Sequence, residues 1–242
     1  MPTGVIINAL AVFLGGLAGT FAGKRLTKEF KEKITLILGV CSLGMGISSI
    51  GLMKNMPAVI FAVVIGTGVG LFMKFGIWVN TGAMLLQRPI AFIFKNQNSD
   101  LSDEEFLPIL VTIIVLFCAS GTGIYGALDA GMTGDQTILI SKSILDFFTA
   151  SIFACTLGLV VSAVAIPQVL IFLVLFFCAK QIYPLTTPDM IADFKACGGL
   201  LMLATGFRMI KIKEFPIADM IPAMILVMPF SYIWTHIILP FI

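Results

Sequence analysis

Two charged residues, Lys142 and Asp146, stand four positions apart in an otherwise apolar stretch. On a helix these positions share a face, so the ammonium and carboxylate groups can pair. Lysine before aspartate is the less favoured order, so helix stability alone is a poor reason for the arrangement. A charge inside a bilayer costs at least about 2.5 kcal/mol on insertion scales, and pairing lowers that cost. The pair is either a structural ion pair near the outer surface or part of a site for a substrate or coupling ion.

The segment that holds this pair, from Ala119 to Asp146, combines apolar residues with many glycines and acids. Its glycines are Gly121, Gly123, Gly126, Gly131 and Gly134, and its other acids are Asp129 and Asp135. Each glycine costs on the order of 1 kcal/mol relative to alanine, so a continuous helix is not expected. Non-helical backbone survives at membrane depth only where protein buries it or where it lines a wet cavity. The segment therefore predicts a broken helix or a re-entrant hairpin, with a structured outer loop as the alternative.

Other polar residues in apolar surroundings add to this candidate site. Lipid cannot satisfy the side chain of Asn8, so we expect it to face another helix or a cavity. Gln168 follows Pro167 in a predicted tight turn, where it would be a capping group. The candidate residues for binding a solute or ion are Asn8, Thr122, Asp129, Asp135, Lys142, Ser143 and Asp146, and the candidate backbone positions are Gly121, Gly123, Gly131 and Gly134.

The sequence has no catalytic or metal-binding pattern. It contains no HExxH, GxSxG or P-loop motif, and its single histidine, His236, has no carboxylate nearby in the chain. The five cysteines lie in or beside apolar runs without a CxxC pair, which is typical of packing residues. We therefore expect no enzymatic activity, no cofactor and no metal. The net charge of +2, without a basic patch, gives no indication of nucleic-acid binding.

The elements that must position these residues are membrane-spanning helices. Of the 242 residues, 59% are apolar and 12% are charged, against roughly half and roughly a quarter in an average soluble domain. Apolar runs longer than about 18 residues are candidates for crossing a bilayer. The sequence predicts an all-α polytopic membrane protein that forms a single domain over residues 1–242. We expect eight spans, at about 3–23, 34–53, 56–74, 105–120, 143–165, 167–183, 196–212 and 219–239.

The positions of lysine and arginine predict the orientation, because inner loops carry an excess of these residues. With the N-terminus outside, eleven of them fall on the inner side and four on the outer side, namely Lys54, Lys142, Lys180 and Lys195. The first apolar run has no positive charge before it, unlike a secretory signal, so we expect a retained helix. Both termini are predicted to lie outside, which is the periplasm in a Gram-negative cell.

Two further features concern how helices lie and pack. Thr81, Arg88 and Lys95 recur every seven residues within 75–98, which predicts a helix in the inner membrane interface, bent at Pro89.

Small residues at four-residue spacing let membrane helices approach closely. Such glycines in the first span serve either packing within the chain or the interface of a homodimer; they are Gly15, Gly19 and Gly23.

A faint internal repeat links the two ends of the chain. Lys33 precedes Gly44 by eleven residues, and Lys195 precedes Gly206 by the same interval. In the predicted topology the two copies run in opposite directions, which is the pattern of the inverted repeats of secondary transporters. Chance similarity between apolar segments is the alternative. The repeat halves would be 1–74 and 167–242, around a central segment 105–165.

Several segments together form a pattern that covers essentially the whole chain. They are IIVLFCASGTGIYGALDAGMTGDQTILISKSILDFFTASIFACTLG (Ile113 to Gly158), INALAVFLGGLAG (Ile7 to Gly19), YPLTTPDMIADFKACGGLLMLATGFR (Tyr183 to Arg208) and the Pro222-Ala223 region. This pattern resembles the YqgA/YdfK family of bacterial membrane proteins. The resemblance implies a multi-spanning protein of the bacterial inner membrane and no settled substrate. It marks as characteristic Gly121, Gly123, Gly131, Gly134, Asp135, Lys142, Ser143 and Asp146.

The polar cluster and the repeat together predict a transporter or channel for a small solute or ion. Its site would lie between the first span, the segment 119–135 and the start of the fifth span. The alternative is a structural or regulatory membrane protein without transport activity, which would bind partner helices through its glycine-rich faces. Membrane lipids would surround the protein in either case.

Overall fold

The computed structural model describes residues 1–22, 26–94 and 103–241, and every regular element within them is helical. The predicted all-α class is therefore confirmed. The longer helices are α1 (Thr3–Ala22), α2 (Lys28–Ile50), α3 (Met56–Phe72), α4 (Phe75–Phe94), α5 (Asp103–Cys118), α6 (Gly121–Thr133), α7 (Thr137–Leu157), α9 (Ala165–Ile182), α10 (Pro188–Met209) and α11 (Ile217–Ile233). The short helical elements are α8 (Val160–Ala163), η1 (Tyr183–Leu185), η2 (Trp234–Ile238) and η3 (Leu239–Phe241).

Most of these helices have the length and composition of membrane spans. Seven of those in the described residues are long and apolar enough to cross a bilayer, and an eighth results if the bent pair α3 and α4 forms one span. Large apolar side chains such as Ile60, Phe61 and Val64 of α3 point away from the protein and are more than half exposed. In a bilayer these side chains would contact lipid. The predicted number of about eight spans agrees with the seven or eight candidate spans of the described residues, although α2 and α10 begin six and eight residues before the predicted spans 34–53 and 196–212.

The fourth predicted span is longer than expected and is broken in its middle. Helices α5 and α6 follow each other within one apolar stretch, Phe106–Thr133. The predicted span 105–120 covers only its first half. The structure therefore has the broken helix that the sequence indicated, and neither the re-entrant hairpin nor the outer loop. Helix α7 begins directly after a short turn, at Thr137, which is six residues before the predicted start of the fifth span at 143.

Helix α4 follows α3 after a bend of 61° and packs against α5. Pro89 lies inside this helix, which continues through it to Phe94. Of the predicted polar stripe, Thr81 and Arg88 belong to α4, and Lys95 lies outside the described residues. The location of this helix at the inner membrane interface stays a prediction.

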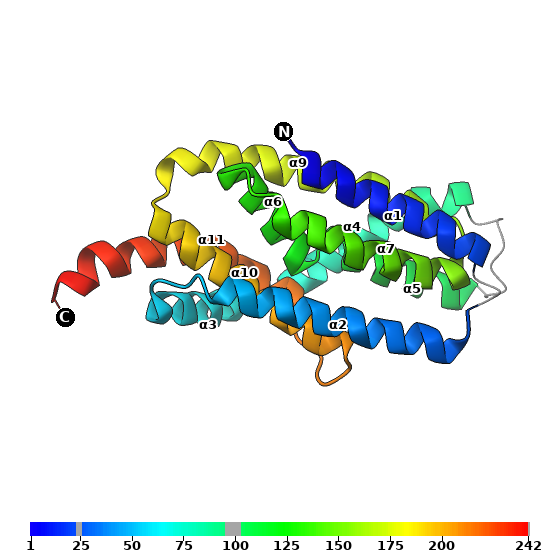
Figure 1. Ribbon diagram of the computed structural model, residues 1–242, viewed down its shortest axis with the longest axis horizontal. Helices are drawn as coiled ribbons and strands as arrows, with labels where there is room; N and C mark the ends of the chain where they lie inside the picture. Colours follow the sequence, from blue (N-terminus) through cyan, green and yellow to red (C-terminus); the bar gives the residue numbers. More distant parts are fainter. Residues whose placement is uncertain (23–25, 95–102, 242) are drawn as a thin grey trace.

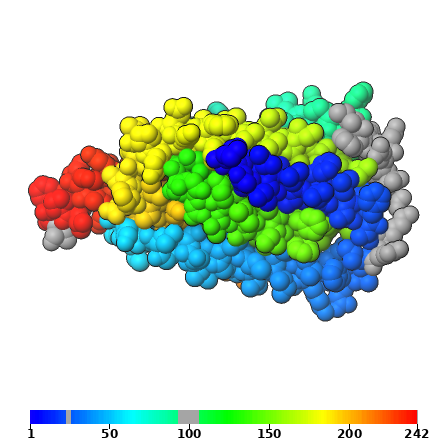
Figure 2. All heavy atoms as spheres, turned by 45° about the horizontal axis from the view of Figure 1, so that its top comes forward, coloured from blue at the N-terminus to red at the C-terminus, as the bar shows by residue number. Residues whose placement is uncertain are grey.

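Helix α1 packs along α7, and the glycines of α1 form the contact. A β-carbon at Gly15 would meet the backbone carbonyl of Phe147, and one at Gly19 would meet that of Ser151. Figure 2 shows α1 on the surface of the molecule over the segments of α6 and α7. Gly15 and Gly19 therefore pack against α7 of the same chain. Gly23 lies outside the described residues. A homodimer through this face stays a prediction, although α7 already covers the face.

Glycines also join α2 to α10. Gly39 lies against Gly206, and Gly46 lies against Gly199, with the backbone of each pair in close approach. Because the residue number rises along α2 as it falls along α10, the two helices are antiparallel. Helices α3 and α11 cross in the same antiparallel way, again through glycines of α3.

The first three helices and the last three correspond in position along the chain. Their last residues lie 159 to 161 positions apart: Ala22 and Ile182, Ile50 and Met209, and Phe72 and Ile233. Within each pair, α1 contacts α9, α2 contacts α10 and α3 contacts α11. In Figure 1, α1 and α9 run along one long side of the molecule, and α2, α3, α10 and α11 form the other, with α6 and α7 between them.

Candidate functional site

The broken span is interrupted at Ala119 and Ser120, where the chain leaves the helical conformation. Ser120 is extended, with φ −72° and ψ 138°, and its Oγ accepts a hydrogen bond of 3.1 Å from the backbone N–H of Gly123. This is the arrangement of an N-cap, which favours the start of a new helix. Helix α6 therefore begins inside the span, with its positive end directed into the protein.

The glycines inside α6 permit close packing rather than breaking the helix, contrary to the prediction. Gly121, Gly123 and Gly131 all lie within α6, where a β-carbon would collide with a neighbouring helix. The β-carbon would meet the side chain of Leu201 at Gly121, the side chain of Phe172 at Gly123 and the backbone of Phe176 at Gly131. Gly134 has a positive φ of 79° and ends α6, and its N–H bonds to the Ala130 carbonyl at 3.1 Å. Only glycine adopts this conformation readily.

Four buried polar side chains from three helices meet beside the start of α6. Lys142 and Asp146 belong to α7, Asn8 to α1 and Gln168 to α9, and none of them is more than 6% exposed. The Lys142 ammonium donates to both Asp146 oxygens, at 2.7 and 2.6 Å. Asn8 Nδ2 donates to Asp146 Oδ2 at 2.9 Å. Gln168 Nε2 donates to Asn8 Oδ1 at 2.9 Å and also to Asp146 Oδ2 at 3.3 Å.

Hydrogen bonds compensate the burial of the two charges in this network. The Asp146 carboxylate is buried, and it accepts hydrogen bonds from three different side chains. Breaking a buried ion pair by removing one partner costs about 3–5 kcal/mol, because the other charge stays buried without compensation. One acceptor is unused: Gln168 Oε1 has no hydrogen-bond partner among the described residues.

A cavity of about 40 Å³ adjoins the ion pair, and seven of the ten residues that line it have polar side chains. One water molecule requires roughly 10–15 Å³ by a comparable measure, so the cavity has room for a few waters or for one small ion or molecule. Its walls come from α2, α5, α6, α7 and α10. The lining residues are Ser42, Leu116, Ser120, Thr122, Lys142, Leu145, Asp146, Thr149, Thr205 and Met209.

Two of the predicted site residues, Asp129 and Asp135, lie in a different cluster around Lys195 of α10. The Lys195 ammonium is 3.1 Å from Asp129 Oδ2, outside hydrogen-bond geometry, and 3.4 Å from Asp135 Oδ2. Hydrogen bonds from the backbone N–H and side chain of Thr137, with Lys195 as a further cause, hold the pKa of the Asp135 carboxyl below its usual value. The prediction that Asp135 supplies charge beside Asp146 is therefore wrong, because the turn after α6 carries it to the end of the helices.

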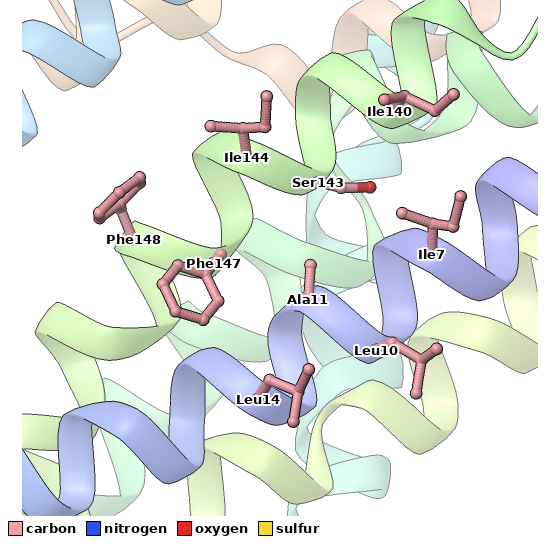
Figure 3. Close-up of a pocket in the computed structure, with 9 residues that line it drawn as sticks. All are labelled: Ile7, Leu10, Ala11, Leu14, Ile140, Ser143, Ile144, Phe147 and Phe148. Carbon is pink, nitrogen blue, oxygen red and sulfur yellow. The ribbon is translucent and has the colours of Figure 1, made fainter.

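Ser143 also lies apart from the cavity. Its hydroxyl donates to the Leu139 carbonyl at 2.7 Å, and its side chain points into a groove between α1 and α7 (Figure 3). The groove measures about 400 Å³, and the other lining residues are Ile7, Leu10, Ala11, Leu14, Ile140, Ile144, Phe147 and Phe148. An open groove of this composition on the outside of a membrane protein suits lipid chains rather than a polar solute.

The structure adds polar residues that the sequence analysis did not place in a site. Gln168 was expected to cap a turn, yet it contacts Asn8 and Asp146. Asp193 of α10 is fully buried and accepts from the backbone N–H groups of Lys54 and Asn55 and from Ser231, so it fixes the connection between α2 and α3. In the described part of the chain, no three His, Cys, Asp or Glu side chains are grouped so that they could hold a metal ion.

Comparison with known proteins gives the family. Residues 3–232 match the family model described as "Protein of unknown function (DUF554)". The chain belongs to the DUF554 family. This DUF554 chain is 48% identical to the uncharacterized protein YqgA of Escherichia coli (strain K12) over 235 residues, which are 97% of the chain and 98% of that protein. It is 25% identical to the uncharacterized membrane protein YdfK of Bacillus subtilis (strain 168) over 240 residues, 92% and 93% of the two chains.

Membership of DUF554 confirms the resemblance seen in the sequence. The name of the Bacillus subtilis relative describes a membrane protein, and the helices of this chain have the length and composition of spans. The DUF554 chain is therefore a multi-pass membrane protein. No solved structure matches it.

Proposed function

We propose that this DUF554 protein is a transporter or channel for a small solute or ion and that the cavity beside Lys142 and Asp146 is its binding site. The observation that carries the proposal is a buried ion pair in the first half of a spanning helix, beside a cavity that is lined mainly by residues with polar side chains. Ionisable groups inside membrane proteins are costly, and they are typically found on substrate and ion pathways or proton relays.

The broken helix supports the same proposal. Discontinuous helices form the central sites of many secondary transporters, because their free ends present N–H or C=O groups to a substrate or ion. Here the break at Ser120 lies at the cavity, and Ser120 and Thr122 both line it.

An inverted repeat is part of the proposal. A shift of about 160 residues brings the ends of α1, α2 and α3 into register with those of α9, α10 and α11, compared with the shift of 162 between Lys33 and Lys195 in the sequence. Under this shift Asn8 corresponds to Gln168, and Ser42 corresponds to Met202. Both pairs are in contact. The carboxamides of Asn8 and Gln168 form a hydrogen bond, and Ser42 Oγ donates a hydrogen bond of 3.1 Å to the Met202 carbonyl.

Contacts between equivalent residues are what a two-fold axis in the membrane plane would produce. Residues on such an axis meet their own counterparts, and the antiparallel contacts of α2 with α10 and of α3 with α11 fit the same relation. The cavity has Ser42 in its wall and adjoins the network of Asn8 and Gln168. Inverted repeats commonly place the substrate site at their interface and alternate its access between the two sides.

The proposed location is the bacterial inner membrane, with both termini outside. The excess of lysine and arginine on the opposite side supports this orientation, since positive residues are retained in the cytoplasm. We propose no enzymatic reaction.

Flux measurements in liposomes test the proposed function. The purified full chain is reconstituted and screened for uptake of ions and small metabolites under proton, sodium and potassium gradients. We expect flux above that of protein-free liposomes, and we expect its loss in Lys142→Met and Asp146→Asn. The matched controls are Lys180→Met and Glu214→Gln, which change exposed residues away from the cavity and should retain the flux.

Two results would contradict the proposal. One is flux that persists in both cavity variants. The other is no flux of any tested solute together with a stoichiometric protein partner on crosslinking in native membranes, which would favour the structural or regulatory alternative.

A further inference from the structure

Some polar groups around the cavity already donate a hydrogen bond to another residue, and others still have a donor available for a ligand. Thr122 is only 5% exposed, yet its hydroxyl makes no hydrogen bond to another residue that the structure describes. The Ser120 hydroxyl accepts from Gly123, which leaves its own hydrogen free. The Lys142 ammonium has three hydrogens, and the two oxygens of Asp146 engage two of them. The cavity therefore presents at least three unused side-chain donors.

The start of α6 lies beside the same wall, which Ser120 and Thr122 line. The first N–H groups of a helix have no partner within the helix and carry a partial positive charge. The cap at Ser120 engages the N–H of Gly123, so those of Gly121 and Thr122 remain. Helix α6 has 13 residues, long enough for this end effect to be established. A helix N-terminus of this kind favours a negative ligand.

Three other hydroxyls on the cavity wall have the opposite character. They donate to backbone carbonyls, so only their oxygen lone pairs face a ligand. These bonds run from Ser42 to Met202, from Thr149 to Leu145 and from Thr205 to Leu201, at 3.1, 2.8 and 2.9 Å. A water molecule can donate to these oxygens and to an anion at once. The cavity thus suits an anion that keeps one or two waters.

Charge balance limits the ligand to a single negative charge. Asp146 also lines the cavity, but Lys142 neutralises its charge, and Asn8 and Gln168 bind it. A cation in this space would lie beside the ammonium of Lys142 and would be repelled by its positive charge. Because Lys142 and Asp146 together are neutral, a bound anion would be balanced only by the partial positive charge at the start of α6 and by hydrogen-bond donors. These can offset a single negative charge but not a buried divalent one.

We infer that the cavity binds a small monovalent anion, of the size of chloride, nitrate or formate, between the Lys142 ammonium, the Thr122 and Ser120 hydroxyls and the start of α6. The inference rests on the proposed function and specifies its substrate class. The volume of about 40 Å³ excludes larger metabolites unless the helices move apart.

A binding measurement tests this without relying on transport. Thermal unfolding of the detergent-solubilised full chain is followed as chloride or nitrate replaces gluconate at constant ionic strength, with sodium against potassium as the cation comparison. Because a ligand that binds the folded state raises the Tm in a saturable way, we expect saturable stabilisation by the small anions and no difference between the cations. Thr122→Val should raise the half-saturating concentration roughly tenfold. Thr112→Val, which removes an exposed hydroxyl from α5, is the matched control and should leave it unchanged.

The liposome assay then separates the inference from the proposed function. Chloride or nitrate flux that falls in Thr122→Val and Lys142→Met, but not in Thr112→Val, supports both. Flux of sodium, potassium or protons without anion flux overturns the anion inference and leaves a transporter. Anion flux and stabilisation that are unchanged in Thr122→Val overturn the assignment to this cavity. Absence of flux for every probe, in protein that unfolds cooperatively, overturns the proposed function itself.

Discussion

The carboxamides of Asn8 and Gln168 bond to each other and to the same oxygen of Asp146, although 160 residues separate them in the chain. The contact joins α1 to α9 at the ion pair of α7. It also joins two positions that are equivalent under the proposed repeat. The axis of the proposed repeat would therefore pass through the hydrogen-bonded group formed by Asn8, Gln168 and Asp146.

Replacing either carboxamide by an apolar residue should destabilise the fold. Asn8→Leu and Gln168→Leu each leave Asp146 with fewer donors, and we expect a loss of about 1–3 kcal/mol in the free energy of unfolding. Because the two residues share Asp146 and each other, the double variant should lose less than the sum of the single variants. Unfolding in mixed micelles measures this, with the exposed Gln181→Leu as the matched control. Additive losses would contradict the shared network.

The glycine contact between α1 and α7 predicts a sharp difference between two similar substitutions. Gly19→Ala places a β-carbon against the carbonyl of Ser151, so we expect strong destabilisation or failure to fold. Gly44→Ala is also within a helix but has open space beside it, so it should be neutral or stabilise by up to about 1 kcal/mol. Comparing the Tm values of the two variants checks this. Equal tolerance of both would mean that α1 does not pack on α7 as described.

Acid should remove the contribution of Asp135 to stability. Its pKa is held below the ordinary value by the donors of Thr137, so the ionised carboxylate stabilises the folded state above the unfolded pKa of about 3.9. That stabilisation is lost as the pH falls through the lower pKa of the folded state. Asp135→Asn should therefore lower the Tm at pH 7, and its difference from the unmodified protein should shrink as the pH falls below about 3.9. The exposed Glu32→Gln is the control. A difference that is constant with pH would show that the carboxylate charge does not matter.

The orientation can be read from a reporter attached to the chain. With both termini outside, alkaline phosphatase fused to the C-terminus should be active in Escherichia coli, and a green fluorescent protein fused there should be dark. The matched comparison is a fusion truncated after α2, which by the same topology should also be active because α2 ends outside. A fluorescent C-terminal fusion would place that terminus in the cytoplasm and reverse the proposed orientation.

Composition and the length of the apolar runs predicted the helical membrane fold well, because backbone that crosses lipid must satisfy its own hydrogen bonds, as long helices do. The ends of the fourth and fifth spans were harder to predict. Glycines at 121, 123 and 131 suggested an irregular backbone, but tertiary packing stabilises a helix there despite their low helix propensity. The spacing of Lys142 and Asp146 predicted their ion pair correctly, since the geometry of one helix fixes it.

Contacts across the chain could not be predicted in this way. Gln168 follows Pro167, and proline suggested a turn, yet proline is tolerated in the first turn of a helix and α9 starts at Ala165. Its contact with Asn8 depends on how α1 and α9 pack. Asp135 was grouped with Asp146 because the two are close in sequence. The short turn before α7 separates them and brings Asp135 to Lys195 of α10 instead.

Side-specific labelling of the cavity tests the central claim most directly. In a chain whose five native cysteines are replaced, Ser42→Cys introduces a thiol into the cavity wall, and Ile113→Cys places one in the apolar core as the control. Oriented liposomes are treated with a small charged thiol reagent from one face and then from the other. A binding site on a transport pathway predicts modification of residue 42, slowed by the bound ligand, and no modification of residue 113. If residue 42 stays unmodified from both faces in folded protein, the cavity is a closed structural void and the account is contradicted.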